Sequence, residues 1–246
     1  MKNEAAWRPS KFVVKNGRLR GSRTTAALSA ASRLNADIVA SLYDRHVPTF
    51  ARGRLLDLGC GNVPLFGLYK RFVSQVVCVD WGNSLHKNEF LDFECDLTQD
   101  LPFPAAAFDT IILSDVLEHI PEPMDLWKEM ARVLCKDGHL IMNVPFFYCL
   151  HEQPHDYFRY TEFALRRFAQ AVGLLPVELL VTGGVPEILT DIVAKTIVSV
   201  PVVGAASAAF LQWVTYGAIN TKLGRTVSAR TARNFPFGYF LVARKA

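Results

Sequence analysis

Two acidic residues follow predicted strands at a spacing that suits a nucleoside ligand. The first, Asp57, stands in the run Leu-Asp-Leu-Gly-Cys-Gly-Asn, where Gly59 and Gly61 permit a tight turn and a close approach of the backbone to a ligand. The second, Asp80, ends an apolar run about twenty residues later, and a carboxylate there can accept hydrogen bonds from ribose hydroxyls. The pair predicts a nucleoside cofactor.

Ionisable side chains are also dense in the segment 151–161, directly after a predicted strand. His155 can act as a general base, and Asp156 can orient its imidazole. Tyr157 and Arg159 can contact a substrate, and the guanidinium suits an anionic one. The segment is therefore a candidate substrate-binding loop, and the alternative is a loop whose polar residues only form hydrogen bonds before a helix.

A second candidate base is His119, which follows another predicted strand. The alternative is a structural role, in which His119 caps a helix or orients a loop. No metal is predicted: His151 and His155 have i,i+4 spacing, but Pro154 argues against a continuous helix that presents both. No His/Cys group has zinc-ligand spacing.

Alternating strands and helices must position these residues. Between 54 and 145 the pattern predicts a parallel sheet covered by helices on both faces, with ligands at the carboxyl ends of its strands. Helices are predicted for Thr24–Phe50 and Thr161–Val172. The last two strands are predicted at Leu174–Val181 and Phe237–Ala243.

These motifs, in this order, resemble the class I S-adenosylmethionine-dependent methyltransferases, especially their small-molecule "type 11" branch. The Asp-x-Gly-x-Gly run resembles the first motif, and Glu94–Leu97 resembles the segment that meets adenine. Phe108–Ile120 and Leu134–Pro145 resemble the fourth-strand motif and the turn with the fifth strand. Pro64 stands where a dinucleotide-binding motif has its third glycine, which disfavours a nicotinamide oxidoreductase.

The resemblance implies an α/β, Rossmann-like, doubly wound fold with a seven-stranded mixed sheet whose last strand is antiparallel. It implies S-adenosylmethionine as cofactor, with Asp80 on the ribose, Trp81 on the adenine face and Asp96 on the adenine amino group. For Trp81, a merely shielding surface residue is the alternative. The residues that it implies for cofactor binding are Asp57, Gly59, Cys60, Gly61, Asp80, Trp81, Asp96, Leu97, Ser114 and Asp115.

The chain is expected to form one domain over residues 1–246: an arm and helix at 1–50, a cofactor-binding core at 51–182, a helical insertion at 183–236 and the last strand at 237–246. The uncharged stretch Thr196–Asn220 is long enough for a membrane span. A span would separate the flanking strands of one sheet, so we expect a buried helical hairpin that caps the substrate or forms a homodimer interface. Peripheral membrane contact is the alternative.

Composition sets further limits. The net charge of +4 is too small to argue for nucleic-acid binding, although the chain before residue 50 and after Asn220 is basic. Five cysteines without a Cys-x-x-Cys pair predict reduced thiols. We therefore expect a cytoplasmic protein, with the inner face of the membrane as an alternative location.

The expected function is methyl transfer to a small molecule or glycan, at oxygen. The segment His155–Tyr160 resembles methyltransferases that accompany bacterial surface-polysaccharide and glycan synthesis. Two alternatives stay open: a quinone or lipid methyltransferase docked on the membrane, and a cofactor-binding partner without catalysis.

Overall fold

A seven-stranded mixed sheet forms the centre of the computed structural model, which describes residues 1–82 and 89–246. Strand β9 is antiparallel to both of its neighbours, and the other pairs are parallel. This arrangement confirms the predicted Rossmann-like fold. In spatial order the strands are β5 (Phe93–Glu94), β4 (Gln75–Asp80), β3 (Arg54–Leu58), β6 (Phe108–Ser114), β7 (Leu134–Pro145), β9 (Gly238–Lys245) and β8 (Leu174–Val181).

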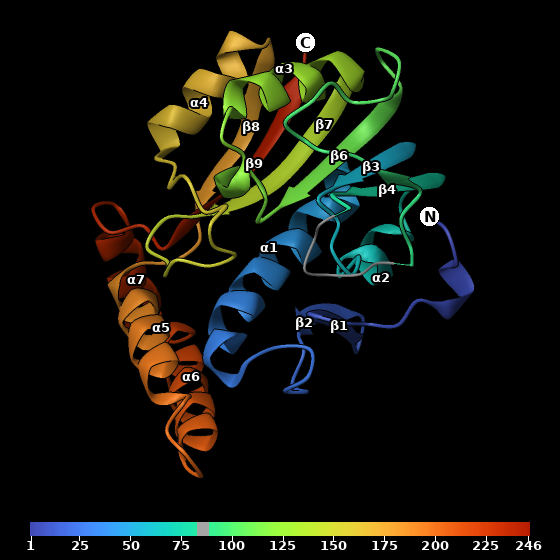
Figure 1. Cartoon of the computed structure of the whole chain (residues 1–246). Helices are drawn as coiled ribbons and strands as arrows, with labels where there is room; N and C mark the ends of the chain where they lie inside the picture. Colours follow the sequence, from blue (N-terminus) through green and yellow to red (C-terminus); the bar gives the residue numbers. More distant parts are fainter. Residues whose placement is uncertain (83–88) are drawn as a thin grey trace.

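Helices cover both faces of the sheet (Figure 1). Helices α1 (Arg33–Phe50) and α2 (Phe66–Tyr69) lie on one face, and α3 (Pro123–Val133) and α4 (Glu162–Ala171) lie on the other. The central strand β3 serves both layers, since Leu55 belongs to the core with α1 and Leu56 to the core with α3. A strand buried on both faces needs such a continuous apolar run.

The helix before the sheet begins later than predicted. It starts at Arg33 and not at Thr24, because a 3₁₀ turn, η2 (Ala30–Ser32), precedes it. The Ser29 side chain accepts a hydrogen bond from the backbone N–H of Ala31 and so caps this turn. Serine favours such caps over helix interiors, which explains the break.

The N-terminal arm contains a hairpin that the sequence analysis did not predict. Its strands are β1 (Phe12–Lys15) and β2 (Arg18–Gly21), and a 3₁₀ turn, η1 (Glu4–Ala6), precedes them. The connecting residues Asn16 and Gly17 have φ of 53° and 74°, which suits a two-residue hairpin turn. The hairpin lies against α1 and holds the arm near the carboxyl ends of the sheet (Figure 1).

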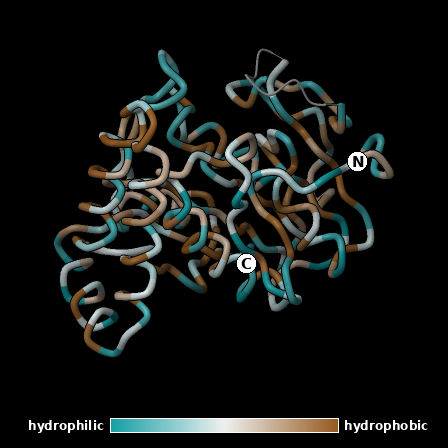
Figure 2. The backbone as a smooth tube through the Cα atoms, turned by 90° about the horizontal axis from the view of Figure 1, so that it is seen from below, coloured by the Kyte–Doolittle hydropathy of each residue, from teal (hydrophilic) through white to brown (hydrophobic). Residues whose placement is uncertain are grey.

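The insertion before the last strand contains three helices that extend away from the sheet (Figure 1): α5 (Val185–Ile197), α6 (Gly204–Ile219) and α7 (Lys222–Ala232). The expectation of a buried hairpin needs correction, because Phe210 and Trp213 on α6 are 64% and 69% exposed. In Figure 2 this part of the tube carries hydrophobic stretches although it lies apart from the sheet. Within 1–82 and 89–246, no helix has the length and apolar character needed to cross a membrane.

One buried polar residue attaches the insertion to the core. Gln212 on α6 is 2% exposed. Its amide oxygen accepts a hydrogen bond from the backbone N–H of Leu34, and its amide nitrogen donates to the carbonyl of Ala31. The side chain therefore satisfies backbone groups at the start of α1, where a helix lacks internal partners.

Candidate cofactor and acceptor site

A cavity of about 670 Å³ lies at the carboxyl ends of β3, β4 and β6. Ligands of open parallel sheets bind at this edge. Of the predicted site residues, the cavity is lined by Gly59, Gly61, Asp80, Trp81, Asp96, Leu97, Asp115, His119, His155 and Tyr157.

The glycine turn after β3 forms one wall of the cavity. Gly59 and Gly61 have φ of 65° and 49°. The backbone N–H of Gly59 donates to the carbonyl of Val79 over 2.8 Å, which ties the turn to β4. A Cβ on Gly59 would lie 2.5 Å from Cγ2 of Val116, closer than side-chain atoms can approach. Both the backbone conformation and the packing therefore require glycine at this position.

The carboxylate of Asp80 is held across the turn. Its Oδ2 accepts from the backbone N–H of Gly61 over 2.8 Å, and its Oδ1 accepts from the backbone N–H of Trp81 over 2.7 Å. The Trp81 ring is 37% exposed and meets the His155 ring edge-on, with centroids 5.2 Å apart. On the neighbouring strand connection, Asp96 Oδ1 accepts from the N–H and the hydroxyl of Thr98.

Asp57 supports the turn from below and does not line the cavity. It is 4% exposed, and Tyr69 donates a hydrogen bond to its Oδ2 over 2.7 Å. Burial raises the pKa of Asp57 to about 7, the hydrogen bond from Tyr69 opposes this rise, and the negative charge of Asp80 adds to it. Two other predicted residues, Cys60 and Ser114, also lie outside the cavity lining.

Asp115 stands at the centre of a polar network that joins the arm to the sheet. It accepts from Lys11 Nζ over 2.9 Å and from the side-chain amide of Asn143. The amide oxygen of Asn143 accepts from the hydroxyls of Tyr43 and Ser114, each over 2.8 Å. Lys11 and Asn143 were not predicted as site residues, since no local motif shows that they contact Asp115, which is distant from both in the chain.

The loop between β7 and α4 closes the cavity. His155 Nδ1 lies 3.1 Å from the Tyr157 hydroxyl, and His119 Nδ1 lies 2.8 Å from the backbone carbonyl of His155. Both histidines line the larger cavity. The loop is joined to the segment after β6, since the N–H groups of Tyr157 and Phe158 donate to the carbonyl of Glu118.

Asp156 and Arg159 act within the loop and do not line the cavity. Arg159 donates to both carboxylate oxygens of Asp156, over 2.5 and 2.8 Å. The guanidinium holds the pKa of Asp156 well below its usual range. The carboxylate also accepts from the backbone N–H of His151 over 3.0 Å, so the structure pairs Asp156 with His151 and Arg159, and not with His155.

A smaller cavity of about 170 Å³ adjoins the first. Asp115 and Glu152 line both cavities, and Lys11, Tyr148 and His151 line only the smaller one. It lies where the N-terminal arm meets the loop after β7, beyond the residues that suit the nucleoside. This position suits an acceptor.

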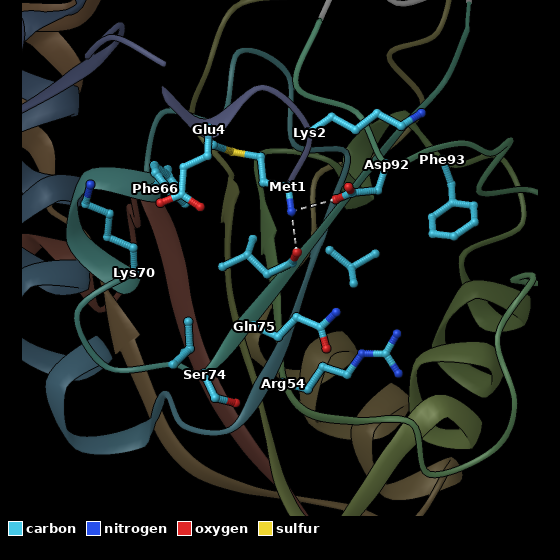
Figure 3. Close-up of a pocket in the computed structure, with 13 residues that line it drawn as sticks. Met1, Lys2, Glu4, Arg54, Phe66, Lys70, Ser74, Gln75, Asp92 and Phe93 are labelled. Carbon is cyan, nitrogen blue, oxygen red and sulfur yellow. Dashed lines mark hydrogen bonds and ion pairs between the residues drawn. The ribbon is translucent and has the colours of Figure 1, made fainter. Parts of the chain in front are cut away.

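Another cavity, of about 580 Å³, lies at the opposite edge of the sheet (Figure 3). Arg54 and Gln75, at the first positions of β3 and β4, line it. The Met1 amino group donates to the carbonyl of Val76 over 2.6 Å and lies 3.1 Å from Asp92 Oδ2. Because it lies at the amino ends of the strands, it is separate from the candidate cofactor site.

Comparison with known proteins agrees with the site. A family model described as a methyltransferase domain matches residues 56–142. Residues 56–142 therefore match a methyltransferase domain, in agreement with the predicted resemblance to the class I, type 11 methyltransferases and with S-adenosylmethionine as the cofactor. The match covers the turn after β3, Asp80, Asp96 and the segment after β6, which are the parts that form the cavity.

Curated relatives resemble part of the chain. The ubiquinone biosynthesis O-methyltransferase of Xanthomonas oryzae pv. oryzae is 26% identical over 126 residues, which cover 47% of this chain and 51% of that protein. That of Xanthomonas euvesicatoria pv. vesicatoria is 28% identical over 103 residues, which cover 38% and 43%. The chain thus spans about half the length of the curated relatives that it matches.

Solved structures share the fold. A S-adenosylmethionine-dependent methyltransferase from Archaeoglobus fulgidus has a TM-score of 0.57 at 16% identity, with 87% of this chain and 97% of that chain covered. The [4+2]-cyclase SpnF has a TM-score of 0.53 at 18% identity, with 96% and 86% covered. Because a cyclase shares this fold, the fold by itself does not define the reaction.

Proposed function

We propose that the protein transfers the methyl group of S-adenosylmethionine to an oxygen atom of a small-molecule or glycan acceptor. The observation that carries this proposal is the junction of the two cavities at Asp115 and Glu152. A donor in the larger cavity and an acceptor in the smaller one would meet there. In-line displacement requires the acceptor atom about 3–3.5 Å from the methyl carbon, which two adjoining cavities can provide.

The cavity residues have distinct roles in this proposal. The carboxylate of Asp80 accepts hydrogen bonds from the ribose hydroxyls, and the exposed ring of Trp81 packs on the adenine. Asp96 accepts from the adenine amino group. His155 is proposed as the general base, because it lines the larger cavity on the same loop as Glu152, where the two cavities join.

Binding of S-adenosylhomocysteine tests the cofactor half of the proposal. Calorimetry of the wild type and of Asp80→Asn should show binding at least about tenfold weaker in the variant, because charge-assisted hydrogen bonds contribute about 1.5–3 kcal/mol. Asp125→Asn is the matched control: this acid lies exposed on α3, where it pairs with Lys128. Folded wild-type protein that fails to bind the ligand would refute the proposal.

Transfer of a labelled methyl group tests the acceptor half. Incubation with isotope-labelled S-adenosylmethionine and separate panels of phenolic and sugar hydroxyl acceptors should give labelled ether products. His155→Gln should lower the turnover by about 10²–10⁴-fold while leaving S-adenosylhomocysteine binding near the wild-type value. Label found only on nitrogen or carbon would refute O-methylation.

A second candidate is a quinone or lipid acceptor delivered at a membrane surface. The exposed Phe210 and Trp213 favour it, since such side chains on α6 can enter the lipid interface. The adjacent helix α7 carries Arg225 and Arg230, which suit anionic head groups. The curated relatives, whose names place them in ubiquinone biosynthesis, support the same candidate.

Vesicle flotation tests this second candidate. The wild type should float with phosphatidylglycerol-containing vesicles, and a variant with both Phe210→Ser and Trp213→Ser should not. Phe163→Ser is the control, because Phe163 is 75% exposed on α4, outside the insertion. The contrary result is a wild type that fails to float and sediments as a dimer, while the double variant sediments as a monomer. That result would assign this surface to a homodimer interface.

A further inference from the structure

Three side chains of types that can ligate a metal meet between the two cavities. Glu118 and His119 come from the 3₁₀ turn η3 (Leu117–His119) after β6, and His151 comes from the loop after β7. One ligand atom from each lies within 4.8 Å of the others. Nε2 of His151 and of His119 lie 3.7 and 3.9 Å from Oε1 of Glu118. His151 is far in sequence from the adjacent Glu118 and His119, so spacing rules could not reveal the cluster.

The carboxylate of Glu118 is buried without hydrogen-bond partners. Its side chain is 0% exposed, and within the described residues neither of its oxygens accepts a hydrogen bond. Nε2 of His119 is also buried and unpartnered there. Leaving a buried polar group unpaired is costly, and such groups in folded proteins call for a physical explanation such as a bound ion.

The other ring nitrogens of both histidines face hydrogen-bond acceptors. His119 Nδ1 lies 2.8 Å from the carbonyl of His155. His151 Nδ1 lies 3.3 Å from the carbonyl of Cys149 and 3.4 Å from Oδ2 of Asp156. Donation from Nδ1 leaves the Nε2 lone pair directed at Glu118. Metal-binding histidines are oriented in this way by carbonyl and carboxylate partners.

Local charge also favours a cation. Lys11 is paired with Asp115, and Arg159 is paired with Asp156. Both of these cations are therefore engaged by other carboxylates, and within residues 1–82 and 89–246 the ion-pair contacts of Glu118 are those with the two imidazoles. With both imidazoles neutral, no cation among the described residues contacts the negative charge of Glu118.

We propose that Glu118, His119 and His151 bind a divalent transition-metal ion through one carboxylate oxygen and two Nε2 atoms. Two imidazoles and one carboxylate suit zinc, cobalt, iron or manganese, and leave positions open to a further ligand. Metal–ligand bonds of about 2.0–2.2 Å would draw the three atoms closer by a few tenths of an ångström or more.

An ion there would bind the acceptor oxygen as a Lewis acid and lower the pKa of its hydroxyl. His119 and Glu152 line the larger cavity, and His151 and Glu152 line the smaller one, so the open positions face the junction. This role rests on the proposed methyl transfer. Metal binding itself does not, and it can be measured without turnover.

Cobalt titration tests the site. Full-length protein treated with a chelator and dialysed is titrated with Co²⁺, and the visible ligand-field bands are followed. The wild type should bind one equivalent, and Zn²⁺ should abolish the bands by displacement. Glu118→Gln and His151→Gln should each weaken binding by more than about 100-fold, and Asp156→Asn, which removes an orienting partner, by about 10–100-fold.

The matched control is His155→Gln, in the same loop, because the His155 side chain is outside the cluster and only its backbone carbonyl contacts His119. It should bind Co²⁺ like the wild type. His119→Gln provides a further ligand variant if Glu118→Gln does not fold, as judged by circular dichroism. Absence of bands in folded wild type would overturn the proposal and leave Glu118 and a protonated His151 as an ion pair. Equal binding by folded ligand variants would also overturn it.

S-adenosylhomocysteine binding is measured on the same chelated samples. Retained nucleoside binding without Co²⁺ binding would refute the metal site and leave the methyltransferase proposal standing. Co²⁺ binding without nucleoside binding would refute the methyltransferase proposal and leave the metal site standing.

Discussion

Replacing Asp57 with asparagine should change how the stability of the protein depends on pH. The carboxyl group is buried, and its pKa is raised from 3.8 to about 7. A pKa that is higher in the folded state gives stability that is fully present below about pH 4 and is lost as pH rises through about 7. A rise of about three units corresponds to about 4 kcal/mol of unfolding free energy. Most of this loss falls between pH 4 and pH 7.

Asp57→Asn removes the titration but introduces an amide N–H beside Tyr69, in a site built for an oxygen. An unpaired buried donor costs about 1–3 kcal/mol. At pH 5, where most of the wild-type carboxyl groups in the folded state are protonated, we expect the variant to be the less stable protein. At pH 8 the wild type must bury a charge. Between pH 5 and pH 8 the wild type should therefore lose about 2–3 kcal/mol of unfolding free energy relative to the variant.

Urea unfolding of the ligand-free protein at pH 5, 6, 7 and 8 measures this shift. Asp125→Asn on the surface should give a profile parallel to the wild type. Tyr69→Phe should steepen the loss at high pH, because the Tyr69 hydroxyl stabilises the Asp57 carboxylate over 2.7 Å. If Asp57→Asn differs from the wild type by the same free energy at every pH, the raised pKa of Asp57 is refuted.

Three further substitutions test the supports of the site. Gly59→Ala should lower the free energy of unfolding by more than about 1 kcal/mol and weaken S-adenosylhomocysteine binding. Gly17→Ala is the control, because Gly17 also has a positive φ but no atom lies within 4 Å of the added Cβ. In urea unfolding it should show only the cost of the strained backbone, and it should bind S-adenosylhomocysteine like the wild type. Gln212→Leu should lower the free energy of unfolding by about 2–4 kcal/mol, because it leaves two backbone groups at the start of α1 unpaired, and limited proteolysis should then cut the insertion faster. Lys11→Met should break the pair with Asp115 and increase proteolysis of the arm, and an unchanged cleavage rate would show that this pair does not hold the arm.

Much of the fold could be predicted because its signals are local. The apolar run before Asp57 and its glycine turn define a strand and a bend within a few residues. The same holds for Thr161, whose hydroxyl accepts from the backbone N–H of Ala164 at the start of α4, where the helix was expected. The hairpin in the arm, which was not predicted, also had a local signal: Asn16-Gly17 between short runs with apolar residues.

The start of α1 and the exposure of α6 could not be predicted in the same way. Helical composition continues from Thr24, and the break depends on the Ser29 cap. The uncharged α6 suggested burial, yet Gln212 is the largest of its buried side chains. The hydropathy of a side chain shows that its burial is favourable, but it does not show whether another part of the protein packs against it. An apolar helix outside the main core can therefore stay exposed.

The sequence by itself determined the class of domain and one wall of the larger cavity, because a glycine turn and strand-end carboxylates carry their geometry within one βαβ unit. Only the tertiary structure decided which distant side chains meet. Lys11 reaches Asp115, Asp156 faces His151 and not its neighbour His155, and Glu118 lies between two imidazoles. These contacts depend on the paths of the loops at the carboxyl ends of the strands. The path of a loop depends on the packing of the whole chain, and short-range sequence patterns do not encode that packing.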